Sequence, residues 1–425
     1  MGGGVQVATA VRRHYEEVLA TGERFFATRA PELANVCWGM ARKFHRGGRL
    51  LIWGPDGAPF SDAQHNAVEF IHPVLVGKRA LPAIAVRSRS QLDTVARPDD
   101  IRMAIDGSRL IIDGTELEVD TADPLVAQEV LETAYHELWE LVHVFFEHEG
   151  LLAEGCTDEV CLTCGDVALP AAVVSVKGAA GLVRTAQGEE EADLTLVQPI
   201  GPGELVLVHG GVALERVKPI DAFSQEFYPF LTSEAVDVPA VLADVAASVR
   251  MKWAEVAQLR RAMDLDQVEA ALALLAERVA AGAHVLTFGN GGSATDSADL
   301  AADLAAIGVP ALDLAGEPSV ITAIGNDIGF EEIYARQVIA LGRPGDVAVG
   351  ISTSGRSGNV LRALRQAKQQ GLATMVLAGY GGGDMAKDGA IDCALVTDSS
   401  YIPRIQEAQA TIYHALVRGL QEARQ

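Results

Sequence analysis

The chain has 425 residues, of which 49% are hydrophobic, 21% charged and 5% aromatic, and its formal net charge at pH 7 is −23. This length predicts two or three domains, each able to bury a core. The negative charge disfavours binding to nucleic acid or to anionic membranes, and no basic patch offsets it. We see no signal peptide and no run of 18 apolar residues, so we expect a cytoplasmic protein without a membrane span.

The first third of the chain alternates helices and strands. An amphipathic helix over 5–45 precedes a buried strand that ends in a Gly-rich turn, "GGRLLIWGPDG" (47–57). Further strands are expected at 81–86 and 97–105, and a long helix covers 126–138. This alternation is typical of an α/β unit with a parallel sheet.

Two helices of this region carry polar pairs. His65 and Glu69, in "DAQHNAVEF", are four residues apart and share one helix face. Gln128 and His136 are eight residues apart, about 80° round the helix, and we expect them to converge on one point. The ordinary alternative is a surface pair and helix filler, because polar pairs four residues apart are common.

The middle of the chain differs in composition. Residues 156–218 contain short β-branched runs separated by Gly, Pro and acidic turns, which predicts a small β-barrel of about five strands. Cys156, Cys161 and Cys164 lie at its start. A structural zinc would need a fourth ligand, for which only His209 is evident, and a redox C-x-x-C normally begins a helix. A reduced thiol cluster, or binding of iron or a partner, stays open.

The last third repeats the first. "GAHVLTFGNGG" (282–292), "VPALDL" (309–314), "RPGDVAVGI" (343–351) and "RIQEAQATIYHAL" (404–416) parallel the four segments above, in the same order. The first copy lacks a match to "GEPSVITAIGNDIGFEEIYARQ" and has "DGSRLIIDG" where the second has "STSGRSGN". We therefore predict two doubly wound, parallel-sheet α/β domains, the first one shortened, flanking a β-barrel: residues 1–150, 151–221 and 222–425.

The second copy carries two loops suited to a phosphate. Gly289, Gly291 and Gly292 let backbone amides approach an anion at a helix N-terminus. Four hydroxyls surround the next helix start, and each can donate to a phosphate oxygen. A helix N-cap, the plainer explanation, needs only one hydroxyl. These hydroxyls belong to Ser352, Thr353, Ser354 and Ser357.

Together "GNGGSATDSADLAADL", "AIGND", "GISTSGRSGN" and "RIQEAQATIYHAL" resemble the sugar-isomerase (SIS) fold, and within it the sedoheptulose 7-phosphate (phosphoheptose) isomerase family. The resemblance covers about 235–425. It implies a phosphosugar pocket lined by Asn290, Gly291, Gly292, Ser293, Asn326, Asp327, Ser352, Thr353, Ser354 and Ser357.

The resemblance also implies a zinc site. The family places a His and a Glu one turn apart after the Gly-rich loop, and a Gln and a His eight apart on the final helix. In the second copy the first pair reads Asp299 and Asp303, which makes catalysis by this copy alone doubtful, because a base withdrawn by about 1 Å can lose on the order of a hundredfold in rate. The second copy retains the family's other pair, the Gln and the His of the final helix, as Gln406 and His414.

The first copy has the full pattern, and its positions are His65, Glu69, Gln128 and His136. We therefore expect a composite site, in which one copy supplies metal and base and the other supplies the phosphate cradle. Glu69 would be the base, with Asp303 at the equivalent position, and His136 or His414 the acid partner. The predicted zinc ligands are His65, Glu69, Gln128 and His136.

The middle module resembles the HypC-type [NiFe]-hydrogenase maturation chaperones through "CLTCGDVALPAAVVSV" and "GELVLVHGGVALERV". The resemblance implies that Cys161 binds iron. In the stand-alone family this Cys is N-terminal, whereas here it is internal, which puts iron handling in doubt.

Three functions follow as hypotheses: a phosphosugar isomerase, a non-catalytic accessory of hydrogenase maturation, or a scaffold. Expected partners are a phosphosugar and hydrogenase maturation proteins or the hydrogenase large subunit. By analogy with the four-unit family assembly, we also expect a dimer of chains.

Overall fold

The computed structural model describes residues 2–73, 78–147, 152, 169–185, 188–209, 211–217 and 238–424. The chain divides into two compact units. One combines Met1–Glu147 with Val238–Gln425, and the other is His148–Asp237. Among the described residues, no helix has the length and apolar character needed to cross a bilayer.

The C-terminal part of the larger unit is a five-stranded, all-parallel sheet of order β12-β11-β13-β14-β15. Its central strands are buried along their whole length, which explains their apolar sequences. The strands are β11 (Val285–Gly289), β12 (Ala311–Asp313), β13 (Val347–Ser352), β14 (Ala373–Ala378) and β15 (Cys393–Val396).

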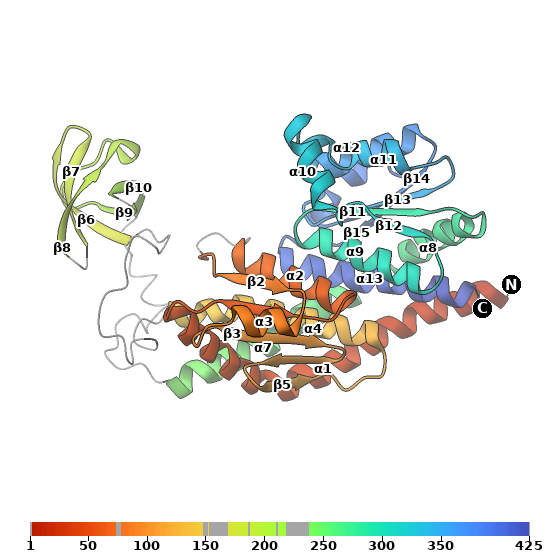
Figure 1. Ribbon diagram of the computed structural model, residues 1–425, viewed down its shortest axis with the longest axis horizontal. Helices are drawn as coiled ribbons and strands as arrows, with labels where there is room; N and C mark the ends of the chain where they lie inside the picture. Colours follow the sequence, from red (N-terminus) through yellow and green to blue (C-terminus); the bar gives the residue numbers. More distant parts are fainter. Residues whose placement is uncertain are drawn as a thin grey trace. The chain divides into compact units, whose positions relative to one another are not determined.

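Helices cover both faces of this sheet, as Figure 1 shows. One face packs against α8 (Leu265–Ala280), α9 (Gly292–Ala306) and α13 (Ile402–Ala423). Over the other face lie α10 (Pro318–Asp327), α11 (Ala335–Leu341) and α12 (Gly358–Gln369). Because both α9 and α12 begin just after a strand, their N-termini meet at the same edge of the sheet.

The N-terminal sheet has the order β2-β1-β3-β4-β5, and its first three strands are parallel. The strands are β1 (Leu50–Trp53), β2 (Ala83–Val86), β3 (Ile101–Asp106), β4 (Arg109–Ile112) and β5 (Thr115–Glu118), and the helices are α1 (Gly2–His45), α2 (Ala58–Ile71), α3 (Arg89–Val95) and α4 (Pro124–Phe146).

The predicted fold class is confirmed, with one difference at the edge of this sheet. The segment "DGSRLIIDG" forms antiparallel hairpins that add β4 and β5. Positive φ angles at Gly107, Asp113 and Gly114 make both turns tight. A hairpin therefore stands where the second copy has its serine loop and α12.

The two copies form a single folded body. Helix α2 packs on α9 and α4 packs on α13, and these contacts join the two copies. Helix α1 packs closely against α7 (Val238–Arg261): a Cβ at Gly22 would lie 2.0 Å from the Trp253 ring. Trp253 is buried and stacks on Phe26.

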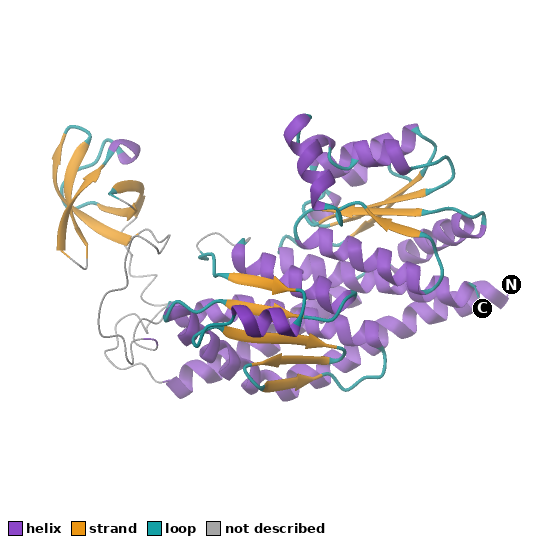
Figure 2. Cartoon of the chain, in the orientation of Figure 1, coloured by secondary structure: helices purple, strands orange, loops and turns teal. Residues whose placement is uncertain are grey.

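The smaller unit is a closed barrel of order β10-β8-β7-β6-β9, which confirms the predicted small five-stranded barrel (Figure 2). Its strands are β6 (Leu169–Lys177), β7 (Ala180–Thr185), β8 (Gly188–Asp193), β9 (Leu205–His209) and β10 (Val212–Val217). Cys156, Cys161 and Cys164 lie outside the described residues, as does the His209 side chain.

Candidate functional site

Four buried side chains meet between the two copies, and we call them the first quartet. His65 and Glu69 come from α2, His136 from α4, and Gln406 from α13 of the other copy. His65 Nε2 lies 3.4 Å from His136 Nε2, 2.9 Å from Gln406 Nε2 and 3.9 Å from Glu69 Oε1. The structure thus brings three of the four predicted zinc ligands together.

Gln128 is the fourth predicted ligand, and its position corrects the expectation that it converges with His136. Its amide lies 3.2 Å from Asp299 Oδ2, and Gln406 takes the place beside His65. Eight helical residues span about 12 Å along the axis, so Gln128 and His136 reach different places despite their similar direction. The glutamine of α4 therefore lies beside Asp299 of the second copy, and the glutamine of α13 lies beside His65 of the first copy.

A carboxylate from the opposite copy orients His136. Its Nδ1 lies 3.0 Å from Glu407 Oε1, and Arg404 Nη1 donates to both oxygens of Glu407 at 2.7 and 2.9 Å. This arrangement directs His136 Nε2 toward His65. On the far side of His65, Nδ1 lies 3.4 Å from the Tyr135 hydroxyl and 3.8 Å from Asp296 Oδ1.

Burial sets the charge state of the first quartet. Burial, with the nearby His136, holds the pKa of His65 well below its usual value, so this imidazole is neutral at pH 7. Burial raises the pKa of Glu69, with His136 and His72 opposing the shift. A neutral imidazole can bind a metal, and a carboxylate with a raised pKa suits proton abstraction near neutral pH.

The donor atoms of the first quartet fit a divalent metal. Glu69 Oε2 and Gln406 Oε1 are buried without a hydrogen-bond partner, and His65, Glu69 and His136 each offer an atom within 4.8 Å of the others. A half-turn of the Gln406 amide exchanges its nitrogen and oxygen and would present the oxygen to His65. Two imidazoles, a carboxylate and an amide oxygen suit zinc.

The Gly-rich loop of the second copy touches the first quartet. A Cβ at Gly292 would lie 2.1 Å from Gln406 Nε2 and 2.7 Å from His65 Nε2. Gly291 caps α9 with a φ of 58°, a conformation that favours glycine. The N-terminus of α9, an anion-binding feature, therefore adjoins His65.

The serine hydroxyls gather as expected at the start of α12. Ser352 Oγ lies 2.9 Å from Ser357 Oγ and 3.5 Å from Ser354 Oγ. Asn290 and Asn359 exchange two amide hydrogen bonds, which join the Gly-rich loop to α12. The remaining predicted pocket residues are placed as follows: Ser293 is buried, Thr353 half-buried, and Asn326 and Asp327 exposed and bonded to each other.

Asp299, Asp303, Gln128 and His414 occupy the matching positions of the repeat, and we call them the second quartet. Asp299 accepts from Gln128, and His414 Nε2 lies 3.5 Å from Asp303 Oδ2. Two of the four predicted catalytic residues, Asp303 and His414, are therefore in contact with each other here. Burial, with Asp62 and Asp303 nearby, raises the pKa of Asp299 well above its usual value.

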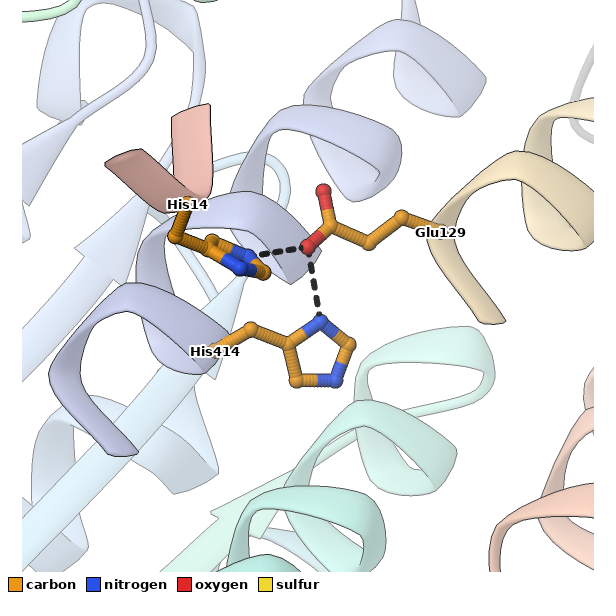
Figure 3. Close-up of side chains that lie close together, drawn as sticks. All are labelled: His14, Glu129 and His414. Atoms are coloured by element: carbon orange, nitrogen blue, oxygen red, sulfur yellow. Dashed lines mark hydrogen bonds and ion pairs between the residues drawn. The ribbon is translucent and has the colours of Figure 1, made fainter. Parts of the chain in front are cut away.

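A buried carboxylate also orients His414 (Figure 3). Glu129 Oε1 lies 2.9 Å from His414 Nδ1 and 2.7 Å from His14 Nε2. Burial opposes the charged form of His414, but hydrogen bonds to Asp303 and Glu129 prevail and raise its pKa to about 9. These two carboxylates therefore favour the charged form of the imidazole.

The sequence interpretation missed several residues around both quartets. Glu129 and Glu407 occupy matching positions of the repeat, one residue after Gln128 and Gln406, so the alignment of the copies carried a signal for them. Asn359 is the last residue of the motif "GISTSGRSGN", which was a signal for it. His14, which lies on α1, lacks such a signal, because only the packing of the chain brings it to the site.

Two family models match the chain: SIS domain over residues 252–379 and HupF/HypC family over 167–225. Phosphoheptose isomerase of Geotalea daltonii is 44% identical over 156 residues, which cover 35% of this chain and 80% of that protein. The enzyme of Paramagnetospirillum magneticum is 40% identical over 197 residues, covering 45% and 94%.

Among solved structures, phosphoheptose isomerase from Neisseria gonorrhoeae is similar, with 34% identity, a TM-score of 0.39 and coverage of 40% of this chain and 96% of that chain. The two sequence relatives exceed 30% identity over most of their own lengths. The chain therefore belongs to the phosphoheptose isomerase family of SIS-domain proteins, and it carries a HupF/HypC-type module within it.

Proposed function

We propose that the chain is a phosphosugar isomerase that interconverts a ketose and an aldose phosphate at the first quartet. The observation that carries this proposal is the contact of Gly292 with His65 and Gln406. It joins the anion-binding loop of one copy to the base and imidazoles of the other. Sedoheptulose 7-phosphate is the substrate to test first, because the relatives are phosphoheptose isomerases.

The chain's own side chains divide the work. Ser352, Ser354 and Ser357 hold the phosphate with the N-termini of α9 and α12. Glu69 removes a proton from the carbon next to the carbonyl and returns it to the neighbouring carbon, since isomerisation through an enediol needs a base at both. Glu407 holds Nδ1 of His136, so that its Nε2 faces the reacting oxygens.

Zinc is the proposed cofactor of this site. His65, His136, Glu69 and Gln406 would hold it, in place of the set with Gln128 that the sequence predicted. A zinc ion supplies Lewis acidity that stabilises negative charge on the substrate oxygens.

The test is turnover of sedoheptulose 7-phosphate by the zinc-loaded full-length chain, in wild type and in Glu69→Gln. The proposal expects turnover in wild type and loss of about 10² to 10⁴ in kcat in the variant, the usual contribution of a general base. Wild-type turnover that survives Glu69→Gln undiminished would exclude Glu69 as the base.

A second candidate function is a role in [NiFe]-hydrogenase maturation. The match to the HupF/HypC family and the closed five-stranded barrel favour it. In this candidate the barrel binds iron or a hydrogenase maturation partner through Cys161, and the SIS pair binds a phosphorylated ligand. Iron in anaerobically purified protein that disappears in Cys161→Ser would support it, and iron unchanged by that substitution would contradict it.

A dimer of chains remains the proposed assembly, and light scattering of the full-length protein measures it.

A further inference from the structure

His65 meets polar side chains at both of its ring nitrogens. Its Nε2 faces the other members of the first quartet, whereas its Nδ1 lies 3.4 Å from the hydroxyl group of Tyr135. Both residues are buried, and Tyr135 comes one residue before His136 on α4. A neutral imidazole carries a single proton, so the group that faces Nδ1 decides which nitrogen stays free to bind a metal.

The proton of the Tyr135 hydroxyl has a fixed acceptor. This hydroxyl donates to Oδ1 of the buried Asp62 at 3.3 Å. Gln128 Nε2 donates to the same oxygen at 3.5 Å and to Asp299 Oδ2 at 3.2 Å. An amide group placed between two carboxylates must turn its nitrogen toward them, because only the nitrogen can donate. Asp62 Oδ1 is therefore an acceptor for both of its neighbours.

Counting donors then assigns the proton of His65. Tyr135 has one O–H, and because this O–H is donated to Asp62, the phenolic oxygen is left to accept a hydrogen bond. Nδ1 of His65 is the donor in reach, so Nδ1 carries the proton and Nε2 carries the lone pair. Burial, with Asp62 and Glu132 nearby, raises the pKa of Tyr135 well above its usual value, which keeps the hydroxyl protonated.

The groups around Nε2 of His65 agree with this assignment. Gln406 Nε2 lies 2.9 Å away, and its N–H finds an acceptor there only if the imidazole nitrogen is unprotonated. Nδ1 of His136 faces the Glu407 carboxylate at 3.0 Å, which leaves Nε2 of a neutral His136 without a proton, 3.4 Å from His65 Nε2. Two lone pairs thus point into the same space, as binding of one metal by both imidazoles requires.

Asp296 is a second polar group on the Nδ1 side of His65. Its Oδ1 lies 3.8 Å from Nδ1, which is longer than a hydrogen bond, and its Oδ2 has no hydrogen-bond partner among the described residues. The Tyr135 hydroxyl is closer and has an acceptor of its own, which fixes the direction in which it can bond. The hydroxyl is therefore the stronger candidate for the partner of Nδ1.

We propose that Tyr135 is a positioning residue for His65: it accepts the hydrogen bond from Nδ1, donates to Asp62, and so keeps Nε2 open for zinc. A hydrogen bond at the second nitrogen of a metal-binding imidazole fixes both its tautomer and its orientation. The inference rests on the proposed function in taking His65 as a zinc ligand.

The chain offers a matched pair of variants. Tyr135→Phe removes the hydroxyl and keeps the ring, whose packing against His65 and His136 is edge-to-face. Tyr413 occupies the same position of the repeat, beside His414, where Asp299 replaces His65. Tyr413→Phe therefore makes the same change where there is no imidazole to position.

The tautomer can be read without zinc or substrate. Full-length chain, isotope-labelled in its histidine nitrogens and stripped of metal, is measured by long-range proton–nitrogen correlation NMR, and His65→Ala identifies the signals of His65. We expect a protonated Nδ1 and an unprotonated Nε2 in wild type, and a mixture of both tautomers in Tyr135→Phe. A proton on Nε2 in wild type, or a tautomer unchanged in Tyr135→Phe, would overturn the proposal. Because this readout needs no turnover, failure of the isomerase function is recognised separately.

Zinc affinity, measured by competition with a chelator, is the second readout. Tyr135→Phe should weaken zinc binding about 10- to 100-fold, as changes to residues behind metal ligands do, and Tyr413→Phe should leave it unchanged. Thermal unfolding of both variants checks that each keeps its fold. Equal weakening in the two variants would overturn the proposal. Weakening in Asp296→Asn but not in Tyr135→Phe would also overturn it, and would assign Nδ1 to the carboxylate.

Discussion

The two quartets occupy equivalent positions of one repeat, yet only the first combines imidazoles, a glutamate and a neighbouring anion loop. At the first, Gly292 leaves the α9 N-terminus open to His65, and the serine loop lies on the same edge of the sheet. At the second, Ala58 and a hairpin take those places. Duplication within one chain therefore allows one site to keep the ancestral residues while its mate changes.

The comparison also shows why neither copy can be removed. Helix α4 and helix α13, the last helix of each copy, each place their histidine in one quartet and their glutamine in the other. Each also supplies the carboxylate that binds the other helix's histidine: Glu407 binds His136, and Glu129 binds His414. A single copy would leave each quartet without a ligand and each histidine without its carboxylate.

The largest expected effect on activity comes from substitutions that disable one quartet at a time. His65→Ala should remove zinc and abolish turnover of sedoheptulose 7-phosphate, since it removes the residue that contacts all other members of the first quartet. Zinc analysis and steady-state kinetics measure this. Asp299→Asn, the matched change in the second quartet, should retain zinc and turnover. Loss of turnover in Asp299→Asn with full activity in His65→Ala would place the chemistry at the second quartet.

A smaller but still large effect is expected from Gly292→Ala. The added methyl group would lie within 2.7 Å of His65 Nε2, so the imidazole and the Gln406 amide must move. A displacement of about 1 Å at a catalytic group costs on the order of a hundredfold in rate. The reciprocal change, Ala58→Gly, should cost at most about 1 kcal/mol of stability and no activity. Gly292→Ala with wild-type kcat and zinc affinity would show that the loop does not constrain the site.

An intermediate effect is expected from the carboxylates that orient the histidines. Glu407→Gln should weaken zinc binding about 10- to 100-fold, as changes to residues behind metal ligands do, and competition with a chelator measures it. Glu129→Gln, its counterpart, should leave zinc affinity unchanged because Glu129 contacts His414. Equal effects of both variants would indicate general destabilisation.

The smallest effect concerns the sheets. Asp100 binds Arg49 through its side chain at 2.6 Å, whereas Asp346, its counterpart, accepts from the backbone of His284 and Arg343. Burial opposes the charged form, but hydrogen bonds, first from Arg49, lower the pKa of Asp100 to about 2. A carboxyl group whose pKa is lower in the folded state stabilises the fold at pH values above its pKa in the unfolded state. This stabilisation is lost as the pH falls from about 4 to 2.

Asp100→Asn should therefore lower the free energy of unfolding at pH 7 by about 1–2 kcal/mol, allowing for the partial exposure of Arg49. The difference from wild type should shrink as the pH falls below 4, and urea titrations at several pH values measure it. A difference that stays constant with pH would mean that the ion pair is not its source.

The repeat explains how much of the site could be predicted from the sequence. The family resemblance, carried onto the first copy by the repeat, identified His65, Glu69 and His136, and four hydroxyls at one helix start identified the serine loop. The partner of each helix was not predictable in this way. Which glutamine meets His65 depends on α4 and α13 packing side by side in opposite directions, a property of the assembled fold.

A different reason explains why the edge of the N-terminal sheet was not predicted. The comparison of the copies shows "DGSRLIIDG" only as a replacement for the serine loop, although its two turn signals flank an apolar run, the pattern of a hairpin. His14 could not be found at all, because a lone histidine on a long amphipathic helix has no local feature that distinguishes it.

The central claim is that one zinc site is assembled from both copies of a single chain. The most direct measurement is a crystal structure of the full-length, zinc-loaded protein with anomalous data at the zinc edge. We predict a zinc peak bounded by His65, Glu69 and His136 of the first copy and by Gln406 of the second. A zinc bound by His65 together with Gln128, or by one copy alone, would contradict the account.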